Sequence, residues 1–155
     1  MHNENTRYAS ILLPMDFSPC SLQARSHAMD FAKTYASTVH VLYVVEPLEL
    51  FTGSDGIEQS VYFDVMQSLR RQAEERMRDV VDDISAEGVP VVSAIREGRP
   101  SDVIADYAAE HGIALICLST HGRSGLNHLV LGSTTEHVLR KATCPVFVVR
   151  CASQG

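Results

Sequence analysis

The sequence predicts an α/β fold with a doubly wound, five-stranded parallel sheet sandwiched by helices. Two observations support this fold class. Short apolar segments alternate along the chain with segments of helical period, and Val, Ile and Leu dominate the apolar segments. Strands that are apolar on both faces are typical of a parallel sheet with helices on both sides. Alternating strands and helices wind into such a sandwich.

The length of the chain suits one domain. Its 155 residues are enough to bury a substantial core. We therefore expect a single domain over 1–155, with an N-terminal tail over 1–8, a loop over 47–61 and a C-terminal tail over 151–155.

The first strand and helix are predicted from the first apolar segment. Residues 11–15 form a short buried strand that ends at Asp16. Ser18 and Pro19 then supply an N-cap and a proline at the first helical position. Apolar residues recur at helical spacing beyond them, which extends the helix to about Ala36.

The middle of the chain supplies two strands and a long helix. β-Branched residues over 39–45 predict the second strand. After the loop, apolar residues from Val65 to Ile84 restore the helical period, and this helix ends near Gly88. Residues 89–95 are expected to form the third strand.

The last part of the chain supplies the remaining strands. Ser101 or Asp102 is expected to cap a helix that stops at Gly112, and residues 113–118 form the fourth strand. The fifth strand is predicted over 146–149, and one more helix precedes it.

A glycine-rich loop without acidic residues separates the fourth strand from that last helix. Gly122, Gly125 and Gly132 mark backbone that can turn tightly or let a ligand come close. Ser133 and Glu136 predict a capping box, with Ser133 as the N-cap. A strand, such a loop and a helix N-terminus are typical of an anion site, most often one for phosphate. In this fold class, ligands bind beyond the carboxyl ends of the strands, near the switch in strand order.

The charge balance narrows the classes of partner. The chain has 13 Lys and Arg against 19 Asp and Glu, a formal net charge of -6. Nucleic-acid binding draws on clustered basic side chains, so neither DNA nor RNA is expected as a partner. No apolar run approaches the roughly 20 residues that span a bilayer, so no membrane partner is expected. The polar N-terminal residues lack the apolar core of a secretory signal, and the expected location is the cytoplasm.

The four cysteines and seven histidines show no metal-ligand spacing, so no metal site is predicted. Cys117 lies in an apolar strand and is expected to be a small buried side chain. Cys20, Cys144 and Cys151 lie at or beyond the ends of elements, and we do not expect a redox role for them. No nucleophile and base accompany the glycine loop, so no catalytic residue is predicted.

Three common signatures are absent from the chain: the G-x-x-x-x-G-K-[ST] P-loop, the G-x-G-x-x-G dinucleotide loop and the G-x-S-x-G nucleophile elbow. The spacing that fits is Ser119, two residues, Gly122, nine residues, Gly132 and Ser133. This resembles the nucleotide-binding signature of the universal stress protein family, Gly-x2-Gly-x9-Gly-Ser/Thr. The resemblance covers nearly the whole chain, through the segments I-L-L-P-M-D-F-S-P, V-H-V-L-Y-V-V-E, R-E-G-R-P, S-T-H-G-R-S-G-L-N-H-L-V-L-G-S and C-P-V-F-V-V-R.

The resemblance implies a Rossmann-like fold that binds ATP, with AMP or ADP as alternatives and Mg²⁺ brought by the triphosphate. Pro14, Met15 and Asp16 would line the adenine and ribose, and Val44 would offer its backbone to the adenine edge. The residues implied around the ribose and α-phosphate are Ser119, His121, Gly122, Arg123, Ser124 and Gly125. The residues implied around the β- and γ-phosphates are Gly132, Ser133 and Thr134.

Some of these roles have plainer alternatives. Asp16 is expected to contact the ligand, and the alternative is that it only helps to cap the first helix. The glycines of the loop are alternatively simple turn residues. Ser119 stands where the signature has its first glycine, and serine would be strained there if that position needs a positive φ.

Three functions follow from the resemblance. The first is a nucleotide-binding stress or signalling module, and the second is a stress protein without nucleotide that acts as a dimeric interaction module. The third is an enzyme related to the ATP pyrophosphatases, which the missing Ser-Gly-Gly-x-Asp-Ser loop disfavours. The resemblance also implies a homodimer through the last strand, formed by Val146, Phe147, Val148 and Val149.

Overall fold

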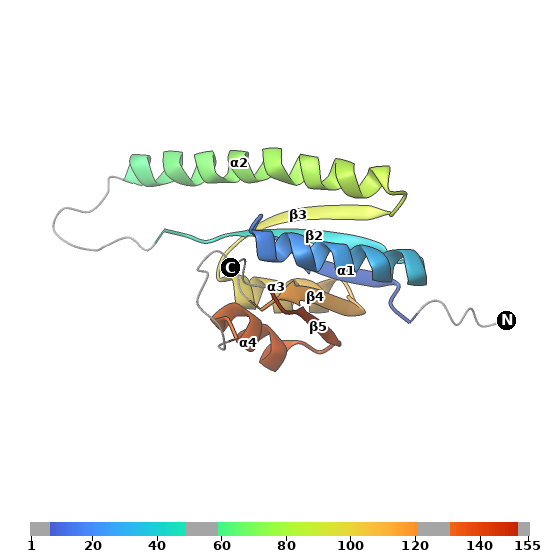
Figure 1. Ribbon diagram of the computed structural model, residues 1–155. Coiled ribbons are helices and arrows are strands. Elements are labelled where there is room, and N and C mark those ends of the chain that lie inside the picture. Colours follow the sequence, from blue (N-terminus) through green and yellow to red (C-terminus); the bar gives the residue numbers. More distant parts are fainter. Residues whose placement is uncertain (1–6, 49–58, 121–130, 152–155) are drawn as a thin grey trace.

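The described residues form one sheet of five parallel strands with helices on both faces (Figure 1). The computed structural model describes residues 7–48, 59–120 and 131–151. The strands are β1 (Ser10–Pro14), β2 (Thr38–Val45), β3 (Val91–Glu97), β4 (Leu115–Ser119) and β5 (Val146–Val149). The helices are α1 (Pro19–Tyr35), α2 (Gln59–Ala86), α3 (Pro100–Glu110) and α4 (Ser133–Lys141). The predicted fold class is confirmed.

The strand order places β1 at the centre of the sheet. The order is β3-β2-β1-β4-β5, so the chain runs outward through β2 and β3 and then returns to the other side of β1. Because all neighbouring strands are parallel, their C-terminal ends meet at one edge, which we call the carboxyl edge. The switch in strand order falls between β1 and β4, where a doubly wound sheet leaves a crevice for ligands.

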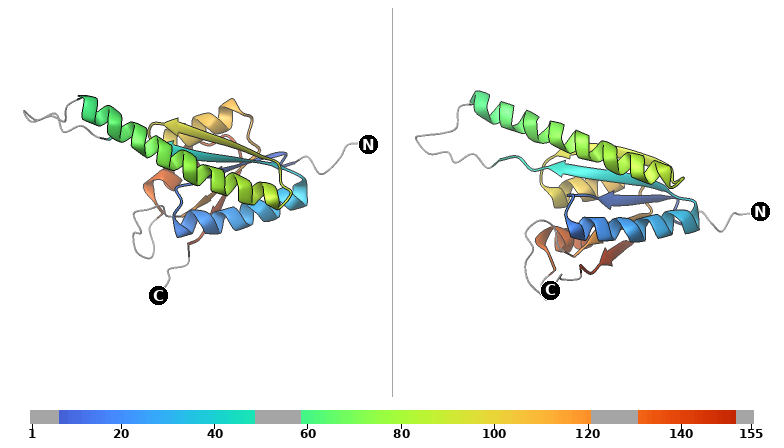
Figure 2. Two further views of the ribbon diagram at one scale, coloured as in Figure 1. Left: turned by 90° about the horizontal axis from the view of Figure 1, so that it is seen from above. Right: turned by 45° about the horizontal axis from the view of Figure 1, so that its top comes forward.

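The two faces of the sheet carry different pairs of helices. Helices α1 and α2 cover one face and bury Ile11 and Leu13, and helices α3 and α4 cover the other and bury Leu12 (Figure 2). Successive residues of a strand point to opposite faces, so a continuously apolar strand contributes to both cores. Within the described residues, no helix combines the length and the apolar character needed to cross a membrane.

The start of α2 differs from the predicted boundary. This helix begins at Gln59, so the last residues of the expected 47–61 loop form its first turn. Residues 49–58 of that loop lie outside the described residues. The helical pattern in the sequence was clear only from Val65, because the first turns of α2 expose Val61 and Phe63 and bury little.

The start of α3 also corrects the prediction. Arg99 is its N-cap and Pro100 occupies the first helical position, so neither Ser101 nor Asp102 caps the helix. A proline suits that position because its φ is already helical and because an N–H there would have no partner within the helix. Ser101 is instead 2% exposed, and the Asp102 carboxylate pairs with Lys141 of α4.

Candidate functional site

The segment after β1 supplies one side of the crevice. Met15 is 3% exposed, and its N–H donates to the carbonyl of Leu42 at 2.8 Å, which prolongs the pairing with β2. Pro14 and Asp16 on either side of Met15 are half-buried. The three residues that the resemblance assigns to the adenine and ribose therefore lie together at the carboxyl edge.

The Asp16 carboxylate takes part in the start of α1. Its Oδ1 accepts from the N–H of Ser18 at 3.0 Å. Ser18 is the N-cap of α1, and its Oγ accepts from the N–H of Ser21 at 3.2 Å, while Pro19 holds the first helical position. The predicted Ser18–Pro19 start is confirmed. The capping role of Asp16 has a direct contact, and its role toward a ligand stays a prediction.

An aromatic pair covers the edge between β1 and β2 on the side of α2. Phe17 has a φ of 61° and stacks on Tyr43 with ring centres 5.0 Å apart. The guanidinium of Arg76 on α2 lies 5.6 Å from the centre of the Phe17 ring. A cation over an aromatic face is an attractive contact. These residues bring a positive charge toward the carboxyl edge, and their spacing in the sequence gave no sign of it.

Val44 presents its backbone to the crevice. The carbonyl of Leu42 faces β1 and accepts from Met15, whereas the carbonyl of Val45 faces β3 and accepts from Gly98 at 3.1 Å. Backbone groups alternate in direction along a strand, so Val44 points its N–H and carbonyl to the same side as Leu42. The last residue of β1, Pro14, pairs with Leu42, so no residue of β1 is paired with Val44. This geometry allows the predicted use of the Val44 backbone, which stays a prediction.

The segment after β4 supplies the other side of the crevice. Ser119 ends β4, and its carbonyl accepts from the Oγ1 of Thr135 at 2.9 Å. The carbonyl of Thr120 accepts from the N–H of Gly132 at 2.9 Å. These two contacts hold the start of α4 against the end of β4. Ser119 and Gly132, which are separated by the glycine-rich loop in the sequence, thus lie close together.

The predicted capping box at α4 is wrong. Gly132 is the N-cap, with φ -58° and ψ 148°, and its carbonyl accepts from the N–H of Glu136 at 2.9 Å. Ser133 therefore lies inside the first turn and is exposed. The Glu136 carboxylate does not reach back to the helix start, because it pairs with Arg140 at 2.6 Å. Glu136 and Arg140 are four residues apart on the helix and form an ion pair, so the Glu136 carboxylate is not used for a capping box.

The start of α4 keeps the character expected of an anion site. Gly132 brings no side chain to cap the helix, so the first-turn N–H groups, those of Ser133 and Thr134 among them, depend on other partners. The positive end of the helix dipole lies at the same place. The other predicted residues of the glycine-rich loop, His121, Gly122, Arg123, Ser124 and Gly125, lie outside the described residues.

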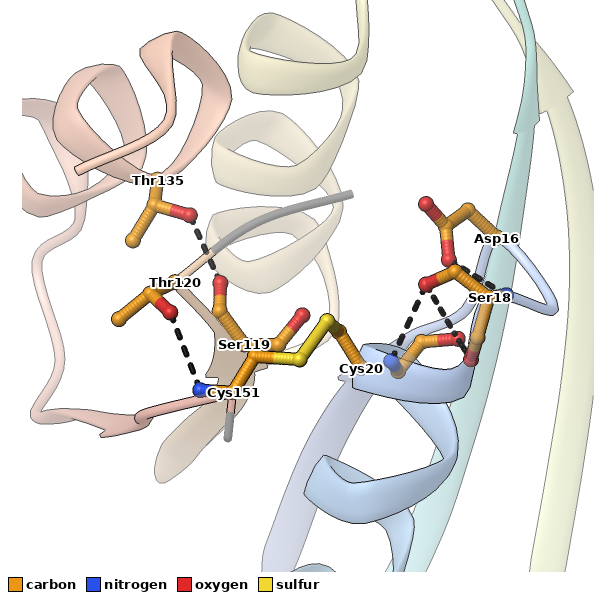
Figure 3. The surroundings of a disulfide bond; sticks show 8 residues. Asp16, Ser18, Cys20, Ser119, Thr120, Thr135 and Cys151 are labelled. Atoms are coloured by element: carbon orange, nitrogen blue, oxygen red, sulfur yellow. Dashed lines mark hydrogen bonds between the residues drawn. A yellow bond between two sulfur atoms is a disulfide. The ribbon is translucent and has the colours of Figure 1, made fainter. Parts of the chain in front are cut away.

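A disulfide between Cys20 and Cys151 lies between the two sides of the crevice (Figure 3). The Cα atoms are 5.2 Å apart, and the sequence separation is 131. Cys20 is in the first turn of α1, and Cys151 follows β5. Cys151 also donates its N–H to the Oγ1 of Thr120 at 3.2 Å. This bond is not among the sequence predictions, and it ties Cys151, the first residue of the expected C-terminal tail, to the first turn of α1.

The topology contains the signal that would have found this pair. Cys20 opens the helix after β1 and Cys151 follows β5, so a parallel sheet brings both to its carboxyl edge. The other two cysteines are free. Cys117 is 0% exposed, and burial raises the pKa of its thiol to about 12. Cys117 is a small buried side chain, as predicted.

Two comparisons of sequence agree with this geometry. A model of the universal stress protein family matches residues 7–150. The chain is also 31% identical to Universal stress protein MJ0531 of Methanocaldococcus jannaschii over 150 residues, which are 97% of this chain and 86% of that protein.

Solved structures show the same fold. The protein MJ0577 has a TM-score of 0.85 and 28% identity, with 96% of this chain and 99% of that chain covered. The universal stress protein UspA from Lactobacillus plantarum has a TM-score of 0.82 and 29% identity, with 93% and 99% covered. The family match spans nearly the whole chain, including both sides of the crevice. This chain belongs to the universal stress protein family.

Proposed function

We propose that this chain is a nucleotide-binding module of stress response or signalling that holds ATP at the carboxyl edge. Occupancy changes its conformation or its partners, and ADP and AMP are alternative ligands. Mg²⁺ arrives with the triphosphate, because that ion keeps several waters and prefers phosphate oxygens to an all-protein site. The role is binding, with slow hydrolysis at most incidental. The module acts as a dimer through β5, and its proposed location is the cytoplasm.

The observation that carries this proposal is the fixed start of α4 beside the end of β4. The N–H of Gly132 and the Oγ1 of Thr135 donate to the carbonyls of Thr120 and Ser119, both at 2.9 Å. A helix start held in this way presents donors and a positive dipole end to the crevice, where a phosphate chain is stabilised. Across the crevice, Met15 and the Val44 backbone leave an apolar and hydrogen-bonding edge suited to a purine.

The glycine at position 132 supports a close approach by the ligand. Its φ of -58° is available to any residue, so the backbone conformation alone does not call for glycine. We attribute the glycine to the space that it leaves for a ligand next to the backbone. A side chain at this position is therefore expected to crowd the phosphates.

A distant structure of the same fold supports an adenine nucleotide as the class of ligand. The universal stress protein from Archaeoglobus fulgidus was solved in complex with dAMP, and it has a TM-score of 0.63 and 22% identity to this chain. That complex concerns the relative. It motivates the choice of adenine nucleotides as the first ligands to test.

The test is thermal unfolding of nucleotide-free protein with and without ATP and Mg²⁺. A ligand at roughly 100 times its Kd stabilises the native state by about 2.7 kcal/mol, which raises Tm by about 5–10 °C for a chain of this size. Gly132→Val should abolish the shift while the unliganded variant stays folded. Thr143→Val places a valine at an exposed position beyond the other end of α4, and should keep the shift.

The result that overturns the proposal is an unchanged Tm in the parent protein at millimolar ATP, ADP and AMP. That result favours the dimeric interaction module without nucleotide. Identification of the nucleotides released when natively purified protein is denatured gives a second, independent readout.

A further inference from the structure

The Cys20–Cys151 disulfide joins the two sides of the switch point. Cys20 lies in the first turn of α1, on the side that carries Asp16 and Ser18 (Figure 3). Cys151 lies on the other side, with Thr120 and the start of α4. The bond thus ties together two segments that the parallel topology brings to one edge from opposite ends of the chain.

Thr120 connects Cys151 to the start of α4 through hydrogen bonds. Thr120 accepts from the N–H of Cys151 at 3.2 Å through its Oγ1, and from the N–H of Gly132 at 2.9 Å through its carbonyl. The N–H of Thr120 donates to the carbonyl of Val149 at 2.9 Å. Thr120 therefore joins β5, the disulfide and the N-cap of α4 in one hydrogen-bonded unit.

We propose that the Cys20–Cys151 disulfide is a reversible redox clasp that keeps this unit, formed by Thr120, Gly132 and Cys151, in order at the carboxyl edge. Reduction removes the covalent tether between Cys151 and the first turn of α1, and the unit loosens. The consequence for nucleotide affinity rests on the function proposed above. A pre-ordered start of α4 binds phosphate with less loss of entropy, so the oxidised form binds more tightly.

The accessibility of the bond fits a reversible role. Both Cys20 and Cys151 are half-buried, so a small thiol has access to the edge where they lie. Disulfides in the cytoplasm, the proposed location, are typically transient or redox-sensing. Cys117, by contrast, is fully buried and its Sγ donates to the carbonyl of Ala24 at 3.4 Å. Cys144 is a half-buried free thiol, and burial raises its pKa, so it forms the reactive thiolate less readily.

The reductant is a thiol of the glutathione class or a dithiol of the thioredoxin class. Its thiolate attacks the Sγ of Cys151, which forms a mixed disulfide and releases Cys20 as a thiolate. Cys20 is the better leaving group because the positive end of the helix dipole at the start of α1 stabilises a thiolate. A second thiolate attacks the mixed disulfide and releases Cys151. The protein gains two electrons and two protons, and the reductant becomes a disulfide.

The first experiment measures hydrogen exchange at single amides in the full chain, oxidised and reduced. Peptide mass spectrometry without reductant should find Cys20 linked to Cys151, and the link should open with dithiothreitol under native conditions. The amides of Thr120, Gly132 and Cys151 should exchange roughly fivefold faster or more after reduction, the lower end of typical coupling between sites.

Matched variants separate the clasp from general thiol effects. Cys20→Ser with Cys151→Ser should show the fast exchange of the reduced protein under both conditions. Cys144→Ser removes a half-buried free thiol and should respond to reduction as the parent does. The proposal is overturned if the two cysteines are not linked, or if reduction leaves the three amides unchanged.

The second experiment measures the affinity for ATP with Mg²⁺ in both redox states. Reduction should weaken binding roughly fivefold or more. Reciprocity then requires bound ATP to lower the reduction potential of the pair by about 20 mV for a fivefold effect. Equal affinity in both states overturns the coupling to the nucleotide. If neither state binds a nucleotide while exchange still responds to reduction, the proposed function fails and the clasp stands.

Discussion

Ser119 shows how a single side chain departs from a family signature without a cost to the backbone. It is the last residue of β4, paired with Val149 of β5, and so it has extended geometry. Among the described residues other than glycine, Phe17 and Ala36 have positive φ. The strain that a serine would suffer in a left-handed conformation is therefore absent at Ser119.

Restoring the signature glycine is therefore expected to bring no gain in binding. Ser119→Gly should change the Kd for ATP by less than about twofold, because the carbonyl that receives Thr135 is already in place. The variant should lose about 0.5–1 kcal/mol of stability, because a glycine in a strand gives up more conformational freedom on folding. Titration calorimetry and denaturant unfolding measure the two effects. A tenfold gain in affinity would show that the side chain of Ser119 obstructs the ligand.

His40 is a half-buried titratable group of β2 that lies beside Tyr107 of α3. Its Nδ1 lies 3.1 Å from the hydroxyl of Tyr107, and its ring centre lies 5.9 Å from that of His111. Arg96 faces the Tyr107 ring at 5.9 Å and pairs with Glu110 at 3.7 Å. Burial, and next the charge of His111, lower the pKa of His40 below its ordinary value of 6.5.

Stability should therefore fall in mild acid. A lowered pKa means that the folded protein binds fewer protons than the unfolded chain, so the contribution of His40 is complete above pH 6.5. It is lost as the pH falls through the folded pKa. His40→Gln keeps a polar partner for Tyr107 and removes the titration. The unfolding free energy of the parent minus that of the variant should decrease as the pH falls from about 8 to 5. A constant difference would contradict the assignment.

At the scale of elements, two helices start in different ways. Ser18 caps α1 through its side chain, whereas the N-cap of α4 is Gly132 and has no side chain to offer. Ser133 follows it as an exposed residue of the first turn. The two serines look alike in the sequence, and each stands at the predicted start of a helix.

These two serines should respond differently to the same substitution. Ser18→Ala should cost about 1 kcal/mol of unfolding free energy, because the N–H of Ser21 loses its acceptor in a buried place. Ser133→Ala should stay within about 0.5 kcal/mol of the parent. Urea unfolding of the ligand-free proteins measures both. A loss at Ser133 equal to that at Ser18 would restore the capping box as the correct description.

The order and type of the elements could be predicted because hydrophobic period reports which faces are buried. The residue at which a helix starts could not, since one residue of backbone hydrogen bonding decides it, as at Pro100 and Gly132. Parallel topology explains why Met15, Val44 and Ser119 meet at one edge. The same topology brings Cys20 and Cys151 to this edge, but a bond between them also requires a short Cα separation, here 5.2 Å, which only the assembled fold sets.

At the scale of the whole molecule, the sheet has two edge strands within the described residues, β3 and β5. An edge strand leaves a row of backbone groups for pairing with another chain. The carbonyls of Pro145 and Val149 accept from Ile116 of β4 and from Thr120 just after it. The N–H and carbonyl of Val148, which alternates with them, therefore point outward at the edge of the sheet. The dimer implied by the family resemblance would use these outward groups.

A proline at that outward position tests the dimer. Val148→Pro removes an N–H that β4 does not use, and an edge strand tolerates such a proline, so the fold should survive while pairing through β5 is lost. The carbonyl of Pro90 and the N–H of Gly98 pair with β2, so Ser93, at an alternate position on β3, faces outward and is exposed. Ser93→Pro is the matched control at the other edge and should leave the assembly as it is. Sedimentation velocity at micromolar concentration should find the parent and Ser93→Pro as dimers and Val148→Pro as a monomer. If Val148→Pro remains a dimer, the interface does not lie at β5. If Ser93→Pro is a monomer while Val148→Pro is a dimer, the interface lies at β3.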